Sequence, residues 1–289
     1  MTPRNHNQLK RLLVHLHVYY HEQVDYFVGK LGNISGVEWD LAVTYSTPHA
    51  ETERKLREVN ANARFIQVEN YGYDVWPFIK VIQQTDLDRY DYVLKLHTKR
   101  SVPQKKFRNV TLTGYGWRDM LVDGVLANAD YFNRLLSIFA NEPATGMLSC
   151  YVTLDRCHRI YRGSSVMREM NRIGLDTDCN LMCHGTMFLA RASVFKGLQQ
   201  EKVNAELFCH EHSLSDVDDT NAHIYERIFS LLPSTVGMAH KGVYPSKSLV
   251  NKMKTYSLLS RALKWLFTID KISESGEKYL IFMGLKFKL

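Results

Sequence analysis

The amino-acid sequence predicts an α/β protein in which a mostly parallel sheet is flanked by helices. Short segments rich in Val, Ile, Leu and aromatic residues recur along the chain, and charged or amphipathic segments of helical spacing separate them. Strands that alternate with helices in this way form parallel sheets, because each parallel connection needs a long crossover. A hydrophobic fraction of 45% and a charged fraction of 23% are ordinary for a globular protein, so we expect a folded core in this chain of 289 residues.

The first half of the chain carries the clearest alternation. Its first apolar segment, LLVHLHVYY, is β-branched and aromatic, with His15 and His17 on one face. A turn that contains Gly72 separates the third strand from the third helix. Strands are expected at residues 12–20, 39–45, 64–68 and 90–97, and helices at residues 22–31, at residues 48–60 and from the turn at Gly72 to about residue 84.

The second half continues the pattern less regularly. Residues 102–116 are polar and are expected to form a loop. Strands are then expected at residues 145–151 and 182–190, and residues 234–239 are expected to return to the sheet. Helices are expected at residues 117–126, 129–141, 161–173, 193–198 and 217–232. We therefore expect residues 1–250 to form one domain.

The remaining segment, residues 251–289, differs from this domain in charge. It contains eight Lys or Arg residues and three Asp or Glu residues, which gives it +5 of the formal net charge of +7. Within residues 257–269, apolar residues recur at helical spacing with Arg261 and Lys264 between them, which predicts a basic amphipathic helix. Such a helix lies at an anionic membrane surface or packs on the body of the protein, and the sequence leaves both open. Because the rest of the chain is close to neutral, no nucleic-acid partner is expected.

Cysteine usage and the lack of targeting signals indicate the compartment. The chain has five cysteines, an odd number that is too sparse for a disulfide framework, which fits reduced thiols. His15 and His17 interrupt the only apolar segment near the start, so no secretory signal is predicted, and no uncharged apolar run reaches the roughly 18 residues of a membrane span. We expect a cytoplasmic protein that is peripheral at the inner face of the cell membrane.

Two loops follow the third and fourth predicted strands, at the sheet edge where α/β proteins bind ligands. In the first loop, Gly72 permits a positive φ, Asp74 is a good N-cap, and Pro77 lies in the first helical turn. A well-built helix start without chemistry explains this pattern. A polar site in which Asn70 and Asp74 contact a base or ribose explains it equally well.

The second loop follows an apolar strand that ends in two polar residues. Lys95 and His97 share one face of this strand, and Thr98, Lys99 and Ser101 come next. Positive charge concentrated at a strand end suits a diphosphate, which would accept charge-assisted hydrogen bonds. The alternative is a solvated basic loop.

The helix expected at residues 217–232 carries a third group of candidates. Asp219 lies at its start, and His223, Glu226 and Arg227 lie within about one turn of each other. An acidic residue at a helix start favours the helix dipole, which is the simpler interpretation of Asp219. A Glu on this face is a candidate general base.

Motifs of several other enzyme classes are absent from the sequence. It contains no P-loop, no Gly-x-Ser-x-Gly elbow and no His-Glu-x-x-His motif. His and Cys pairs occur without the further ligands of a zinc site. Hydrolase and ATPase functions therefore have no support.

Ordered blocks of this sequence resemble the rhamnan synthesis protein F family of glycosyltransferases in polysaccharide assembly. The most specific block is YDYVLKLHTKRS at residues 90–101, and the others lie at residues 15–20, 40–44, 70–78, 117–118, 185–191 and 223–229. One position departs from the pattern, because the family usually has Arg where this chain has Tyr73. If that Arg contacts phosphate or sugar in the family, this chain either replaces it or prefers another donor.

The resemblance implies a nucleotide-sugar donor, a growing lipid-linked glycan acceptor and a fold similar to that of A-type glycosyltransferases. Many of those enzymes place an Asp-x-Asp metal motif after the fourth strand, where this chain has the sequence LHTK. Cationic side chains would then replace part or all of the metal's neutralisation of the leaving diphosphate. We expect no metal ligands and no certain cofactor, and a divalent cation (Mg²⁺ or Mn²⁺) can take part without being strictly required.

Glycosyl transfer needs a base for the acceptor hydroxyl and stabilisation of the departing diphosphate. Glu226 is the first choice for the base, with Asp219 and Asp74 as alternatives, and we expect an inverting displacement. His97 and Lys99, with Lys95, are assigned to the diphosphate. The other residues expected to contact a substrate are Asn70, Gly72, Asp74, Thr98, Ser101, Trp117, Arg118, Gly185, Thr186, Arg191, His223 and Arg227.

The expected activity is transfer of rhamnose, or of a related hexose such as galactofuranose, to an O-antigen, capsule or rhamnan. The alternative from another class is a catalytically inactive sugar-binding or scaffold subunit of an assembly complex.

Overall fold

The computed structural model describes residues 9–107, 110–209 and 220–245, together with three strands near the C-terminus. The chain divides into two compact units. Residues 1–107 and 111–245 belong to the first unit, and residues 108–110 and 246–289 belong to the second. The division lies a few residues before the domain boundary that the sequence predicts.

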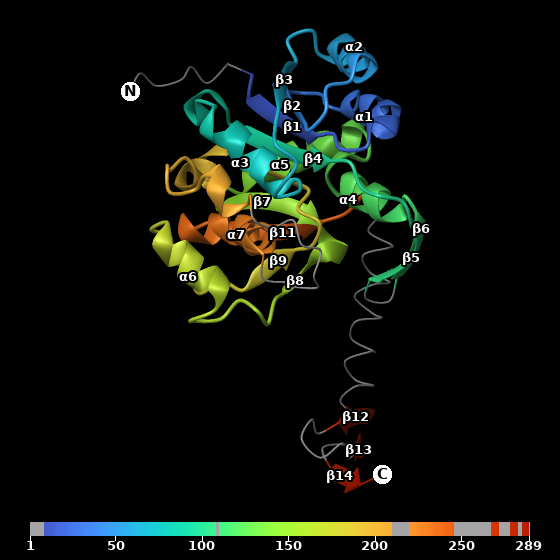
Figure 1. The fold of residues 1–289 in the computed structure, drawn as a ribbon, viewed down its shortest axis with the longest axis vertical. Coiled ribbons are helices and arrows are strands. Elements are labelled where there is room, and N and C mark those ends of the chain that lie inside the picture. The colour runs from blue at the N-terminus through green and yellow to red at the C-terminus, as the bar shows by residue number, and fades with distance from the viewer. Residues whose placement is uncertain are drawn as a thin grey trace. The chain divides into compact units, whose positions relative to one another are not determined.

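The first unit is built on a seven-stranded sheet of order β11-β7-β10-β4-β1-β2-β3 (Figure 1). Strands β4, β1, β2 and β3 are parallel, and β11 is parallel to β7, whereas β10 is antiparallel to both of its neighbours. The mostly parallel sheet predicted from the sequence is confirmed. Its strands are β1 (Arg11–His17), β2 (Glu38–Tyr45), β3 (Arg64–Gln67), β4 (Tyr92–His97), β7 (Thr145–Cys150), β10 (Phe188–Arg191) and β11 (Ala239–Val243).

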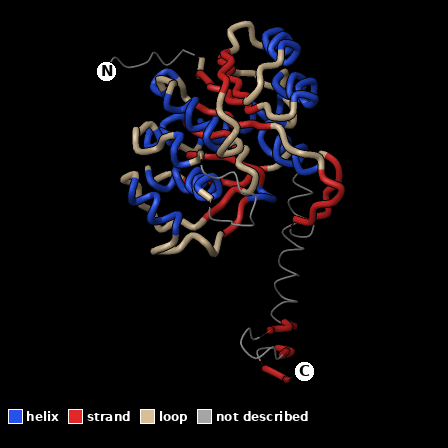
Figure 2. Tube along the Cα trace, viewed as in Figure 1, coloured by secondary structure: helices blue, strands red, loops and turns tan. Residues whose placement is uncertain are grey.

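Helices cover both faces of this sheet (Figure 2). Successive strand residues point to opposite faces, so Leu13 joins a core cluster with residues of α3 and α7, while Leu12 is buried on the other face. The helices are α1 (Val24–Leu31), α2 (Ala50–Val59), α3 (Val75–Gln83), α4 (Gly116–Leu126), α5 (Ala129–Asn141), α6 (Ser165–Arg172) and α7 (Asn221–Thr235). Short 3₁₀ turns are η1 (His21–Gln23), η2 (Leu87–Arg89), η3 (Tyr151–Thr153), η4 (Ala192–Leu198) and η5 (Ala205–Leu207).

A hairpin replaces the loop expected at residues 102–116. Strands β5 (Val102–Phe107) and β6 (Val110–Gly114) form a two-stranded sheet of their own beside α4 (Figure 1). Lys105 and Phe107 are half-buried, whereas Gln104 and Lys106 are exposed. Because a proline and several polar residues interrupt the segment, its sequence lacks the apolar alternation by which a strand is predicted.

The single strand expected at residues 182–190 is two strands. β9 (Leu181–Cys183) pairs with β8 (Leu154–Arg156), whereas β10 joins the large sheet. Between them, Gly185 and Thr186 have positive φ angles. Strand residues have negative φ, so the pairing ends at this turn.

The described residues of the second unit are β-structure. Strands β12 (Phe267–Lys271), β13 (Lys278–Phe282) and β14 (Leu285–Lys288) form an antiparallel sheet. The amphipathic helix expected at residues 257–269 is therefore wrong for residues 267–269, and residues 257–266 lie outside the described part. A short apolar segment fits a strand as well as a helix, so its periodicity alone does not decide. Within the described residues, no helix has the length and apolar character to span a bilayer.

Gly124 lies where α4 packs on β7. A Cβ atom on Gly124 would stand 2.5 Å from the Cβ of Cys150 and 2.8 Å from its Cα. Since the strand backbone would have to move, we expect Gly124→Ala to lower the free energy of unfolding by about 1–3 kcal/mol. A Cβ atom on Gly29 in α1 would meet no heavy atom within 4 Å, and Gly29→Ala should raise this free energy by about 0.5–1 kcal/mol. Urea denaturation compares the two, and equal stability would contradict the close packing.

Candidate functional site

Five buried polar side chains form a layer on one face of the sheet, near the carboxyl ends of its parallel strands. In the parallel register, His15 of β1 lies beside Lys95 of β4, and His17 lies beside His97. Thr44 of β2 lies on the other side of His17. All five side chains are at most 5% exposed. The face that is apolar at the start of these strands thus becomes polar at the edge where α/β proteins bind ligands.

Asp74, immediately before α3, supplies the opposite charge. Its Oδ2 lies 2.5 Å from Lys95 Nζ and 3.3 Å from His97 Nδ1, and it accepts a hydrogen bond of 2.9 Å from Thr186 Oγ1. Lys95 Nζ also donates to the Thr186 carbonyl at 3.1 Å, and Lys99 Nζ lies 3.7 Å from Asp74 Oδ1. The Asp74 side chain does not bond to its own helix. It therefore acts as the centre of an ion cluster, not as the N-cap side chain expected from the sequence.

The ion cluster keeps Asp74 charged. Burial by itself would raise the pKa of Asp74, but His97, Lys95 and Lys99 reverse this effect and hold the pKa well below its usual range. Burial lowers the pKa of Lys95, and the Asp74 carboxylate opposes that shift. Because Lys95 is fully buried and paired, its position favours a supporting role over the direct diphosphate contact assigned from the sequence.

The histidines of the layer are neutral. Burial lowers the pKa of His17 to about 4 and holds those of His15 and His97 well below the usual range. His15 Nε2 and His17 Nδ1 each hydrogen-bond to Thr44 Oγ1, at 2.8 Å and 3.0 Å. His97 Nε2 is buried and has no hydrogen-bond partner among the described residues. At neutral pH, His97 therefore brings a polar ring nitrogen to the site, not the positive charge expected from the sequence, and its effect on the pKa of Asp74 arises at acid pH, where the ring is protonated.

Two turns with left-handed backbone lie on either side of the ion cluster. Gly72 and Tyr73 have φ angles of 67° and 50°, and Gly185 and Thr186 have φ angles of 87° and 48°. Such backbone costs a residue with a side chain roughly 1–2 kcal/mol, and it tends to occur at functional sites. The bonds of Thr186 to the cluster compensate this cost, and they place the turn before β10 against Asp74.

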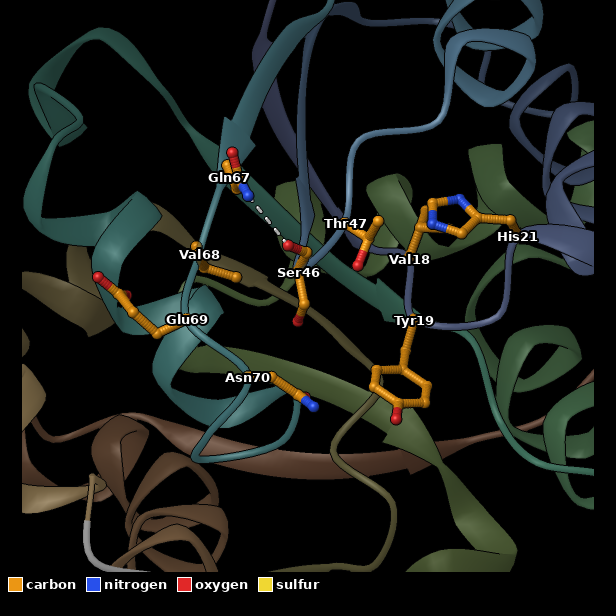
Figure 3. Close-up of a pocket in the computed structure, with 9 residues that line it drawn as sticks. All are labelled: Val18, Tyr19, His21, Ser46, Thr47, Gln67, Val68, Glu69 and Asn70. Atoms are coloured by element: carbon orange, nitrogen blue, oxygen red, sulfur yellow. Dashed lines mark hydrogen bonds between the residues drawn. The ribbon is translucent and has the colours of Figure 1, made fainter. Parts of the chain in front are cut away.

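A cleft of about 730 Å³ opens at the carboxyl ends of β1, β2 and β3. This is the size of a small-molecule site. Figure 3 shows Tyr19 and Asn70 on facing sides of it, with Ser46 and Thr47 between them. Of the residues predicted from the sequence, Asn70 lines the cleft. The full lining is Val18, Tyr19, His21, Ser46, Thr47, Gln67, Val68, Glu69 and Asn70.

Thr98 joins the loop after β1 to the loop after β4. Its Oγ1 accepts hydrogen bonds from the backbone N–H groups of Tyr19 and Tyr20, at 3.0 Å and 3.1 Å. Gln23 Nε2 donates to the carbonyl of Lys99 at 2.9 Å. These bonds hold the cleft wall next to the basic loop, while the Lys99 side chain remains 24% exposed.

Helix α7 places Glu226 and His223 close enough to the ion cluster for their charges to interact with it. Burial raises the pKa of Glu226, the negative charge of Asp74 raises it further, and Lys99 and His223 act in the opposite direction. The Glu226 residue is still partly exposed to solvent. The ring of Tyr73, which is 54% exposed, lies 6.1 Å from the ring of His223. The candidates on α7 and the two loops therefore share one region.

Some predicted residues have structural partners. Arg118 is buried, pairs with Asp119 at 2.8 Å, and lies over the ring of Tyr26. Arg227 is also buried, and its Nη1 donates to the carbonyl of His223 at 3.1 Å. Their positions favour holding α4 and α7 in place over contacting a substrate.

Arg191 lies at the opposite edge of the sheet, which corrects the expectation that it belongs to the site. Its Cα partner is Tyr92 at the start of β4, and its guanidinium donates to the carbonyls of Phe139 and Thr145. Because β10 is antiparallel to β4, the end of β10 meets the beginning of β4. Ser101 is exposed, and Asp219 lies outside the described residues.

The sequence interpretation left out four residues of this region. His15 and His17 are expected from the sequence to be ordinary core or surface histidines. They are nevertheless two residues apart in the first strand, as Lys95 and His97 are in the fourth, so each pair lies on one face of its strand. Gln23 and Lys105 carry no motif. Lys105 is half-buried in the hairpin, with its Nζ 3.8 Å from the centre of the Trp117 ring. Trp117 itself, a predicted contact, is buried beside Gly185.

In the part of the chain that the structure describes, no group of three or more His, Cys, Asp or Glu residues could hold a metal ion. The cations nearest to Asp74 are Lys95 and Lys99. The weak metal dependence expected from the sequence stays a prediction.

The structure is that of an α/β protein with a polar cleft at the carboxyl edge of its parallel strands, where proteins of this class bind ligands. The family model of rhamnan synthesis protein F matches residues 1–238, so the chain belongs to that family. The resemblance seen in the ordered blocks is confirmed. Rhamnan is a polysaccharide, and the family name therefore connects the chain with polysaccharide synthesis.

Other similarities are more distant. "Uncharacterized protein WxcX" from two strains of Xanthomonas campestris pv. campestris, B100 and ATCC 33913, is 23% identical over 220 residues. The match covers 75% of this chain but only 30% of WxcX, so the chain spans less than a third of that relative.

Two solved structures are similar at low TM-score. The crystal structure of 4-diphosphocytidyl-2C-methyl-D-erythritol synthase has a TM-score of 0.40 and 11% identity, over 83% of this chain and 90% of that one. S. aureus TarS 1-349 has a TM-score of 0.41 and 9% identity, over 88% of this chain and 65% of that one. Likeness of this degree says nothing about function.

Proposed function

We propose that the chain is a glycosyltransferase that moves a sugar from a nucleotide-sugar donor to a growing cell-surface polysaccharide. The observation that carries this proposal is the cleft at the ends of β1, β2 and β3, joined through Thr98 to the basic loop of Lys99. A polar cleft suits a nucleoside, and an adjoining ammonium group suits the diphosphate attached to it. Membership of the rhamnan synthesis protein F family supports a polysaccharide as the product.

Each part of the site has a role in this proposal. Asn70 and Tyr19 contact the base or ribose from facing sides of the cleft. Lys99 contacts the diphosphate. Asp74 and Lys95 form a rigid charged wall behind it, because both are buried and each satisfies the other.

Glu226 is the base that accepts the proton of the acceptor hydroxyl. Its raised pKa brings it closer to neutral pH, where a general base is most effective. Asp74 is less suited, because its pKa is held well below the usual range and its carboxylate is already engaged. Attack of the acceptor oxygen on the anomeric carbon breaks the bond to the diphosphate, and a single displacement inverts that carbon.

The remaining details of the proposal come from the sequence. The donor sugar is rhamnose or a related hexose such as galactofuranose, and the acceptor is a lipid-linked glycan of an O-antigen, capsule or rhamnan. The protein works in the cytoplasm, peripherally at the inner face of the membrane. A divalent cation can assist at the diphosphate without being strictly required, since Lys99 lies there.

Nucleotide binding tests the proposal directly. In calorimetric titrations with UDP, dTDP and GDP, we expect one nucleotide to bind, and Asn70→Ala to weaken it by about 3- to 10-fold through loss of a hydrogen bond. Asn141→Ala, at the exposed end of α5, is the matched control and should bind as the wild type does.

Turnover separates the enzyme from an inactive subunit. Sugar derivatives of the nucleotide that binds are then incubated with the protein and lipid-linked glycan acceptors, and release of nucleoside diphosphate is measured. Release that His97→Ala abolishes would support the enzyme. Binding without any release would support a sugar-binding or scaffold subunit, and no binding at all would contradict the proposed cleft.

A further inference from the structure

The hairpin of β5 and β6 presents alternate side chains to the body of the protein and to solvent. Lys105 and Phe107 face inward and are half-buried, while Lys106 between them is exposed. The ring of Phe107 packs on the ring of Trp117, with 4.9 Å between the centroids, and on that of His184 at 5.2 Å. The hairpin is thus attached to α4 and to the turn before β10.

Trp117 connects Lys105 to the ion cluster. The Lys105 Nζ lies 3.8 Å from the centre of the Trp117 ring, within the range of a cation–π contact. A Cβ atom on Gly185 would stand 3.2 Å from Trp117 Cζ2, and the next residue, Thr186, bonds to Asp74. The ring contact therefore fixes the Lys105 ammonium on the side of the site that carries the turn before β10.

Among the residues that the structure describes, the charges around this ammonium are not balanced. Burial lowers the pKa of Lys105, the nearby Lys99 lowers it further, and Glu226 acts in the opposite direction. Asp74 is already engaged by Lys95, at 2.5 Å, and the pKa of Glu226 is itself raised. Among these groups, the ammonium ions of Lys105, Lys99 and Lys95 outnumber the carboxylates of Asp74 and Glu226 by three to two, so the ammonium ions repel one another. An anionic ligand relieves this repulsion, and a doubly charged one relieves it most.

We propose that Lys105 of the hairpin, together with Lys99, binds the diphosphate of the nucleotide sugar. This proposal rests on the proposed function. It adds a second cation to the diphosphate site, supplied by strand β5, which follows the basic loop in the chain. The two lysines reach the ligand from different elements, Lys99 from the end of β4 and Lys105 from β5. Charge-assisted hydrogen bonds from both would neutralise the leaving group as its bond to the sugar breaks.

The test uses inorganic pyrophosphate and the nucleoside diphosphate that binds the wild-type protein, both titrated by calorimetry. Lys105→Met keeps an unbranched side chain on the indole but removes the charge, and we expect it to weaken binding of both ligands by about 10-fold or more. Lys106→Met is the matched control on the outward face, and it should change binding less than 2-fold. Lys105→Arg should restore most of the affinity, because it restores the charge.

Salt dependence gives a readout that a purely structural role of Lys105 would not change. The affinity of the wild type for the nucleoside diphosphate should fall more steeply with salt concentration than that of Lys105→Met, since one ion contact is lost. Melting temperatures within about 3 °C of the wild type would show that the variants are folded. If Lys105→Met is unfolded, the comparison of Lys105→Arg and Lys105→Gln replaces it.

The outcomes distinguish the two proposals. Equal affinities of Lys105→Met and Lys106→Met, with normal binding by the wild type, would overturn the role of Lys105 and leave the proposed function intact. A wild-type protein that binds none of the nucleoside diphosphates would overturn the proposed function. A 10-fold loss confined to Lys105→Met, restored by Arg, would establish the hairpin as part of the diphosphate site.

Discussion

Asp74→Asn is expected to lower the free energy of unfolding by about 3–5 kcal/mol at neutral pH, because it leaves the buried ammonium of Lys95 without its counter-charge. Lys95 Nζ is 2.5 Å from Asp74 Oδ2, and the two side chains are 0% and 8% exposed. Asn keeps the shape of Asp and an acceptor for Thr186, so the loss measures the charge. Urea denaturation followed by circular dichroism gives the difference.

Two controls interpret this loss. Asp88 and Lys196 form an ion pair at the same distance of 2.5 Å, but their side chains are 68% and 49% exposed. Asp88→Asn should therefore change stability by less than about 1 kcal/mol. The double variant Asp74→Asn/Lys95→Met should recover much of the loss, because no buried charge remains. A loss of equal size at both ion pairs would contradict the role given to burial.

The pH dependence of this difference has a definite sign. The folded-state pKa of Asp74 is lowered. The contribution of Asp74 to the free energy of unfolding is therefore fully present above its unfolded-state pKa of about 3.9, and it is lost as the pH falls through the folded-state pKa. The gap between wild type and Asp74→Asn should therefore narrow below about pH 4. His17, with a pKa lowered to about 4, destabilises both proteins as the pH falls below about 6.5. Because Asp74 raises the pKa of His17, the gap between the two proteins reports the Asp74 carboxylate together with its effect on this histidine.

The same residues show how far the sequence predicts the site. Lys95 and His97 could be found because alternation in an apolar strand places them on one face, and the strand end marks the ligand edge. The partnership of His15 with Lys95 depends on the register between β1 and β4, which connects residues far apart in the chain. Periodicity within one strand carries no information on the register between two strands. His15 and His17 are therefore not among the site residues predicted from the sequence.

Strand direction explains the main error of placement. Arg191 follows a strand-like segment, and in an all-parallel sheet it would lie at the ligand edge. β10 is antiparallel to β4, however, so Arg191 meets Tyr92 at the far edge while Phe188 meets Lys95. The left-handed turn at Gly185 and Thr186 separates β9 from β10, and only the structure shows it. The same turn brings Thr186 within hydrogen-bonding distance of Asp74.

Glu226→Gln is expected to lower the rate of sugar transfer by about 10²- to 10⁴-fold, because it removes the proton acceptor and keeps the size of the side chain. The affinity for the nucleoside diphosphate should not fall, since Glu226 is assigned to the acceptor and the variant removes a negative charge near Lys99 and Lys105. Release of nucleoside diphosphate from the donor, measured with and without acceptor, gives the rate. In the wild type, activity should decline as the pH falls through the raised pKa of Glu226, which lies above the ordinary value.

Stability provides the reading that separates a base from a structural residue. A carboxyl whose folded-state pKa is raised contributes most to the free energy of unfolding when the pH is below its unfolded-state pKa of about 4.3. This stabilising contribution is lost as the pH rises through the folded-state pKa. At neutral pH, the ionised Glu226 is therefore a cost to the fold, and Glu226→Gln should be at least as stable as the wild type. A variant that is inactive but no less stable is what a general base predicts. Full activity in Glu226→Gln together with loss of activity in Asp219→Asn would instead move the base to Asp219, the alternative that the sequence offers just before α7.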